Sequence, residues 1–184
     1  MSAGGTDDQG STGHRGCDGR GSEPERSRAV RLIADAMLGR LAKALRMLGF
    51  DVTYDPFIED RELIQRAREQ ERVLLTRDTG LLRRGHLPAH VFVESDHVQE
   101  QLGQVARELG LKLDRGAAFT RCIVCNEPLA AVDKDLVRAQ VPPYVYATQE
   151  RFSRCTGCGR IYWRGTHVER MERKIDEIGA DQGV

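Results

Sequence analysis

Short apolar stretches alternate with amphipathic stretches over residues 29–116. Four of the apolar stretches have the length and composition of buried strands: AVRLIAD, FDVTYD, RVLLT and HVFVE. Each is followed by residues whose apolar positions recur with helical spacing, and the first of these predicted helices spans 37–48 and ends at Gly49. Four alternations of strand and helix predict an α/β fold, with a parallel sheet flanked by helices.

The segments on either side of this region have a different character. Residues 1–28 are rich in Gly, Ser, Asp and Arg and contain too few apolar side chains to form a core, so we expect them to be disordered. Residues 117–180 contain two short segments built around cysteines and, near 167–178, an amphipathic pattern that predicts a helix. The sequence therefore predicts a tail, an α/β domain over 29–116 and a small C-terminal module.

Composition and charge exclude several classes of protein. The chain has 184 residues, of which 40% are hydrophobic and 30% charged, and its 28 basic and 28 acidic residues give no formal net charge. This balance argues against a polycation that binds nucleic acid by bulk charge, although a local basic face stays possible. No apolar run reaches the ~18–20 residues that a membrane helix needs, and no signal peptide is recognisable, so we expect a cytoplasmic protein without a membrane partner.

Two C-x-x-C motifs contain four of the five cysteines: Cys122, Cys125, Cys155 and Cys158. Two such motifs can supply four thiolates to one tetrahedral site, which is the geometry preferred by structural Zn²⁺. Asn126 and Gly159 follow the second cysteine of each motif and suit a backbone with positive φ. The alternatives are redox chemistry, for which one C-x-x-C motif would suffice, and unpaired cysteines in a core.

Four aspartates fall where the strands of an open α/β sheet end and the next helices begin: Asp35, Asp60, Asp78 and Asp96. Ligands of such sheets bind at the carboxyl ends of the strands, and clustered carboxylates suit Mg²⁺ or Mn²⁺. Such an ion can activate water for attack on a phosphodiester. The alternative is that Asp60, Asp78 and Asp96 cap helices, Asp96 with Gln99 in a capping box, whereas Asp35 has no evident structural need.

Several blocks of the sequence, taken together, resemble the Mut-seven C-terminal RNase family. They are AD-AMLGRLAKALRMLGFDVTY, ERVLLTRDTGLL, ESDHVQEQL, FTRCIVCNEPL and RFSRCTGCGRIYWRGTHVERM. The resemblance runs in order from about residue 30 to residue 173. It implies a PIN-like nuclease domain followed by a zinc ribbon, and metal-dependent hydrolysis of RNA.

The resemblance also implies roles for the acidic residues. Asp35 would be the first metal ligand and Asp78 the third, with Thr76 and Arg77 supporting the pocket. Asp60 would be the second acid, with Glu62 as a nearby substitute. Asp96 would be the fourth, and Glu94 lies two residues before it.

Two basic segments are candidates for binding RNA, because basic side chains contact phosphates and aromatic rings stack on unpaired bases. They contain Arg40, Lys43 and Arg46 in the first helix, and Arg160, Trp163, Arg164 and His167 after the second cysteine motif. The alternatives are a solvated helix face and an aromatic core beside the zinc.

The leading hypothesis is therefore a ribonuclease whose zinc ribbon helps to dock RNA, with a ribosome or tRNA as further possible partners. A non-catalytic RNA- or ribosome-binding protein and a toxin-like PIN protein are the competing hypotheses.

Overall fold

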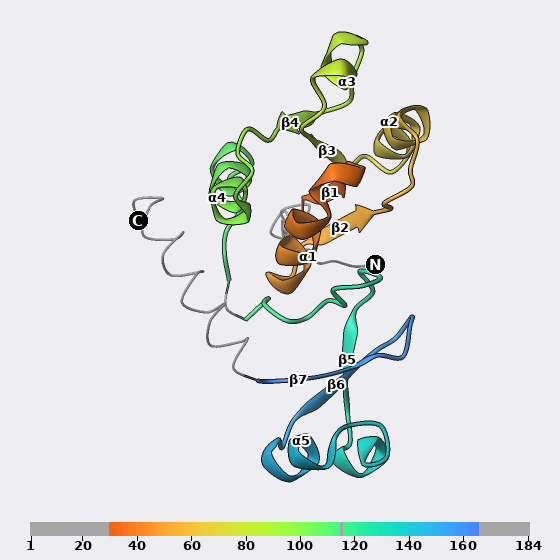
Figure 1. Ribbon diagram of the computed structural model, residues 1–184, viewed down its shortest axis with the longest axis vertical. Coiled ribbons are helices and arrows are strands. Elements are labelled where there is room, and N and C mark those ends of the chain that lie inside the picture. The colour runs from red at the N-terminus through yellow and green to blue at the C-terminus, as the bar shows by residue number, and fades with distance from the viewer. Residues whose placement is uncertain (1–29, 115, 166–184) are drawn as a thin grey trace, which may run out of the picture.

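The computed structural model describes residues 30–114 and 116–165 (Figure 1). The predicted tail 1–28, the predicted helix near 167–178 and the candidate residue His167 lie outside these residues. Within them, no helix combines the length and the apolar character needed to cross a bilayer.

Four parallel strands form the first sheet, in the order β2-β1-β3-β4. Their bounds are β1 Arg31–Ala34, β2 Asp51–Tyr54, β3 Val73–Thr76 and β4 His90–Phe92. The predicted α/β fold with a parallel sheet is therefore confirmed. Since all four strands run in the same direction, the residues that follow them meet at one edge of the sheet, called the carboxyl edge below.

Helices cover both faces of this sheet. They are η1 Ala36–Leu38, α1 Gly39–Met47, α2 Asp60–Glu69, α3 Thr79–Arg83 and α4 Val98–Glu108. Helices α1 and α4 pack together in one apolar core, and α2 and α3 contribute to the other. Strand β1 serves both cores, because Leu32 and Ala34 point into the first and Ile33 into the second. Figure 1 shows α4 and α2 on opposite sides of the sheet.

A second, antiparallel sheet forms the C-terminal module, in the order β5-β6-β7. Its strands are β5 Leu129–Val132, β6 Phe152–Cys155 and β7 Ile161–Trp163. The long connection between β5 and β6 contains η2 Lys134–Val137 and α5 Pro143–Thr148, which pack on a small core around Phe152. Sequence patterns identified no helix between the two cysteine motifs. In the structure Pro143 is the first residue of α5, where its missing N–H removes no helical hydrogen bond.

The link between the two sheets lies against the end of α1. Gly49 ends that helix with φ +92°, and a Cβ at this position would lie 2.1 Å from the carbonyl oxygen of Ala117. The backbone N–H of Phe119 donates to the carbonyl of Met47 at 2.8 Å. Gly49 is therefore required both by its positive φ and by the close approach of the linker.

Candidate functional site

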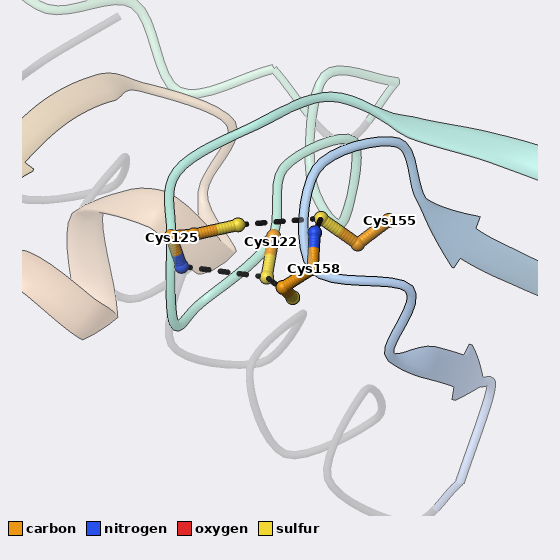
Figure 2. A group of neighbouring side chains, drawn as sticks. All are labelled: Cys122, Cys125, Cys155 and Cys158. Atoms are coloured by element: carbon orange, nitrogen blue, oxygen red, sulfur yellow. Dashed lines mark hydrogen bonds between the residues drawn. The ribbon is translucent and has the colours of Figure 1, made fainter.

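The four cysteines of the two C-x-x-C motifs converge on one point (Figure 2). All four sulfur atoms lie within 4.8 Å of one another. Cys122 Sγ is 3.6 Å from Cys158 Sγ, and Cys125 Sγ is 3.3 Å from Cys155 Sγ. A tetrahedral Zn²⁺ with bonds of about 2.3 Å requires sulfurs about 3.8 Å apart, so this donor set fits one zinc ion.

The two motifs form matching turns. The backbone N–H of Cys125 donates to Cys122 Sγ, and that of Cys158 donates to Cys155 Sγ. Asn126 has φ +71° and Gly159 has φ +73°, which confirms the positive φ predicted at both positions. The two sulfur–sulfur contacts given above join one motif to the other, whereas a redox C-x-x-C pair closes within one motif. This geometry favours a metal centre over redox chemistry.

The surroundings of the cluster shift the pKa values of Cys122 and Cys125 in opposite directions. Burial raises the pKa of Cys122, but the backbone N–H of Cys125, the Tyr162 hydroxyl and the N–H of Val124 together lower that pKa to about 6. Desolvation and contacts with the other thiols raise the pKa of Cys125 to about 12. The cluster therefore favours a thiolate at Cys122, and a bound cation would favour loss of the protons from the other thiols.

Arg46 attaches the first cysteine motif to the sheet, and the prediction that it contacts RNA is corrected by its position. Its side chain is buried, with 3% of the residue exposed. Its Nε donates to the carbonyl of Val52 at 2.8 Å, and its guanidinium also donates to the carbonyls of Ile123 at 3.1 Å and Val124 at 2.8 Å. Side chains three residues apart on a helix drift by about 60° at each step, so Arg46 has turned away from the face of Arg40.

Asn126 makes the second attachment, through contacts that sequence reasoning missed. Its Oδ1 accepts from the N–H of Val52 at 3.1 Å, and its Nδ2 donates to Asp51 at 2.7 Å. Asp51 also accepts from Arg72 at 2.7 Å. Strand β2 is the outer strand of the sheet, and Asn126 and Arg46 satisfy the two backbone groups of Val52 that would otherwise be unpaired there. No sequence signal identified these contacts, because they join residues far apart in the chain.

Thr76 links the carboxylate of Asp35 to the backbone of Asp78 at the carboxyl edge. Asp35 follows β1 and is 8% exposed, and Thr76 ends β3 and is fully buried. Thr76 Oγ1 donates to Asp35 Oδ2 at 2.6 Å and accepts from the backbone N–H of Asp78 at 3.0 Å. The predicted supporting residue Thr76 therefore contacts both of these acidic residues.

Asp60 and Asp96 lie at the same edge, but each forms an ion pair. Asp60 at the start of α2 pairs with Arg84 at 2.8 Å, and Asp96 pairs with Arg77. Arg77 and Asp96 line a cavity of about 350 Å³, and Arg40 is also among its lining residues. The cavity thus combines the acidic side chain of Asp96 with three basic side chains, and its lining includes Ala36, the residue after Asp35.

The alternative hypothesis that these aspartates cap helices is correct for Asp78 and wrong for Asp60 and Asp96. Asp78 caps α3 by accepting from the N–H of Gly80 at 2.7 Å, and Asp35, which had no evident structural need, caps η1 by accepting from the N–H of Met37. Asp60 and Asp96 are not N-caps, because Glu59 and His97 occupy those positions.

Gln99 also makes no capping box with Asp96. Ser95 instead accepts from the N–H of His97 and donates to Glu100.

Among residues 30–114 and 116–165, the cysteines form the one tight group of three or more side chains able to ligate a metal. The four aspartates are therefore not gathered to the same degree. Mg²⁺ commonly binds one or two carboxylates and keeps several waters, so its chemistry does not require all four aspartates.

The other candidate RNA contacts are at the surface. Arg40, Lys43, Arg160 and Arg164 are exposed. Arg40 and Lys43 line the cavity at the carboxyl edge, and Trp163 is 38% exposed on β7.

Comparisons with known proteins identify the family. The sequence model of the Mut7-C RNAse domain matches residues 30–175. The human protein named exonuclease mut-7 homolog is 29% identical in an alignment of 164 residues, which covers 86% of this chain but 16% of the human protein. No solved structure matches the chain. The match to the family model extends over both sheets and the cysteine centre, and the chain belongs to the Mut7-C RNAse domain family.

Proposed function

We propose that this protein is a metal-dependent ribonuclease that hydrolyses RNA phosphodiester bonds at the carboxyl edge of the parallel sheet. The observation that carries the proposal is the linkage of Asp35 and Asp78 through Thr76, in a chain that belongs to an RNAse domain family. This proposal is supported by the fact that Asp35 and Asp78 follow two neighbouring parallel strands, because α/β sheets commonly bind their ligands at the carboxyl ends of their strands.

Asp35 and Asp78 would hold Mg²⁺ or Mn²⁺, with Asp60 and Asp96 as further acidic groups of the pocket. The bound ion would supply Lewis acidity for activating water and stabilising the developing charge. Thr76 fixes the orientation of the Asp35 carboxylate, because its hydroxyl hydrogen is directed at Oδ2. Arg77 holds Asp96, while Arg40 and Lys43 bind the phosphates of the incoming RNA.

The zinc centre has a structural role in this proposal. Four thiolates leave no open coordination position, so a zinc bound there has no site for substrate. Zinc would instead hold the first cysteine motif in the shape that lets Asn126 and Arg46 bind β2. The C-terminal module would then dock RNA through its exposed arginines.

A second candidate function is RNA binding without cleavage. The observation that favours it is that Asp35 and Asp78 both accept hydrogen bonds from backbone N–H groups, which gives each a structural use without a metal ion. The two candidates differ in whether the negative charge of these residues is needed.

Asp78→Asn separates the two candidates, because asparagine caps helices about as well as aspartate but removes the charge. The assay measures cleavage of single-stranded and structured RNA by the zinc-loaded full chain, with Mn²⁺ added or withheld. Chelators are avoided, since they would also remove zinc. We expect cleavage to require Mn²⁺ and to fall by at least about 100-fold in the variant.

Asp133→Asn is the matched control, because Asp133 caps η2 in the C-terminal module in the same way. It should cleave like the unmodified chain. Equal cleavage by the Asp78→Asn variant would refute the proposed site. Retention of RNA with no cleavage by any of the proteins would favour the binding function.

A further inference from the structure

A groove of about 780 Å³ lies between the end of α1 and the C-terminal module. Its apolar lining comes from both parts of the chain: Met47, Phe119, Ile123, Leu129 and Ile161. Tyr162 and Trp163 of β7 also line it. Sites for small organic molecules have volumes of about 300–1,000 Å³ and are mostly apolar, so the groove has the size and character of a ligand site.

The charges of the groove are all of one sign. Arg121, Arg151 and Arg164 line it, and no Asp or Glu does so within the described part of the chain. Arg121 has a structural use, since it donates to the carbonyls of Gly49 at 3.2 Å and Asn126 at 3.0 Å. Arg151 is exposed and has no hydrogen bond or ion pair to another described residue, so its charge is available to an anion.

We propose that this groove binds unpaired nucleotides of RNA, with the bases among the aromatic side chains and a phosphate against Arg151. This inference rests on the proposed function only in taking RNA as the ligand. A nucleotide joins a flat apolar base to an anionic phosphate, which is the combination that the apolar walls and the arginines complement. A base inside a duplex has both faces covered by its neighbours, so the groove should select single strands.

The groove lies apart from the proposed catalytic site and would act as a separate binding subsite for RNA. It does not share a lining residue with the cavity at the carboxyl edge, so it is a separate subsite. RNA held there would engage the C-terminal module while another part of the strand reaches the acidic residues. The groove would thereby contribute to affinity and to single-strand preference, and not to the chemical step.

Trp163 allows a direct test, because it is the one tryptophan of the chain and lines the groove. The test titrates zinc-loaded full-length Asp35→Asn protein, in which the proposed cleavage is blocked, with a 12-nucleotide single-stranded RNA and with the corresponding duplex. We expect the single strand to quench tryptophan emission and to bind at least about tenfold more tightly than the duplex.

Arg151→Gln identifies the phosphate contact. It should weaken single-strand binding about five- to tenfold and lower the slope of log K against log salt concentration by about 0.7. Arg138→Gln is the matched control, because Arg138 is an exposed arginine of the same module that does not line the groove. It should leave both quantities unchanged. The zinc content of each variant verifies that the module has folded.

Each result decides the proposal independently of catalysis. RNA binding with no change of emission, or equal affinities for the Arg151→Gln and Arg138→Gln variants, would overturn the groove and point to another occupant, such as a protein segment. Mn²⁺-dependent cleavage by the unmodified chain alongside that result would leave the proposed function standing. Quenching and the arginine effect without cleavage would support the groove and refute the nuclease.

Discussion

Thr76 Oγ1 donates a hydrogen bond to Asp35 Oδ2 over 2.6 Å, between the ends of two neighbouring strands. The contact is shielded from solvent, since Thr76 is fully buried and Asp35 is 8% exposed. The same hydroxyl oxygen accepts from the backbone N–H of Asp78. One threonine therefore sets both the orientation of the first acidic residue and the turn that carries the second.

Replacing Thr76 tests this arrangement. Thr76→Val keeps the shape of the side chain but leaves Asp35 without its nearest donor, so we expect the free energy of unfolding to fall by about 1–3 kcal/mol. Mn²⁺-dependent cleavage should fall by about 10–100-fold, because the carboxylate loses its fixed orientation. Urea unfolding and RNA cleavage measure the two effects.

Thr76→Ser is the control, because it restores the hydroxyl. It should recover most of the cleavage and most of the stability. If the valine variant cleaves like the unmodified chain, Thr76 does not position the acidic residue for catalysis.

A pair of substitutions at Asn126 separates its backbone conformation from its hydrogen bonds. Asn126→Gly tolerates φ +71° but loses the contacts with Val52 and Asp51, and should cost about 2 kcal/mol of unfolding free energy. Asn126→Ala loses the same contacts and adds left-handed strain, and should cost about 1 kcal/mol more. Chemical denaturation of the zinc-loaded variants measures both. A glycine variant as stable as the unmodified chain would show that the side chain does not hold the motif to the sheet.

Ionisation of Asp51 should make the free energy of unfolding depend on pH in the acidic range. Burial raises the pKa of Asp51, but the hydrogen bonds from Arg72 and Asn126 outweigh it and lower that pKa below its ordinary value of 3.8. A carboxyl with a lowered pKa in the folded state stabilises the fold above its unfolded pKa, and this stabilisation is lost as the pH falls through the folded value. We therefore expect the contribution of Asp51 to be complete above about pH 5 and to decline below pH 3.8.

Asp51→Asn provides the comparison for this pH dependence. The variant should be less stable than the unmodified chain near neutral pH, and the difference should narrow below pH 3.8. Unfolding free energies measured at a series of pH values test this. A difference that stays constant over the whole range would contradict a role for the ionised carboxylate.

Much of the fold was predictable, because its signals are local. Strands β1 to β4 and the helices that follow them are predicted by apolar runs, helical spacing and end signals such as Gly49. Gly49 has a φ of +92°, a backbone conformation that glycine adopts more easily than any other residue. Helix α5 was missed because a Pro-Pro pair indicates a loop as readily as a helix start. The strand order was beyond local patterns, since it depends on how the helices pack.

The candidate site was predictable one residue at a time, but its partners were not. Strand ends identified Asp35 and Asp78, yet the bond between Asp35 and Thr76 joins residues 41 positions apart. The prediction for Arg46 was wrong, because a charged residue in a helix suggested a surface contact with RNA. Tertiary packing instead directs its guanidinium to the carbonyls of Ile123 and Val124 in the cysteine motif.

Loss of zinc should expose the outer strand of the parallel sheet. Cys158→Ser removes one thiolate, and we expect weaker zinc binding and faster amide hydrogen exchange at Val52, whose N–H depends on Asn126. Leu74 is the internal reference, because its N–H donates to Ala89 within the sheet. Cys17→Ser, outside both cysteine motifs, is the control variant. Unchanged exchange at Val52 after verified loss of zinc would contradict this coupling.

The most direct test of the central claim compares Asp35→Asn with the unmodified chain, both zinc-loaded, in RNA cleavage with and without Mn²⁺. The side-chain oxygen of asparagine can still accept from the Met37 N–H, while its NH2 group replaces the oxygen that accepts from Thr76, so the variant removes the charge and that one hydrogen bond. We predict cleavage that depends on Mn²⁺ in the unmodified chain and is lost in the variant, while RNA binding persists. Cleavage by the variant at the unmodified rate would contradict the assignment of Asp35 as a catalytic metal ligand.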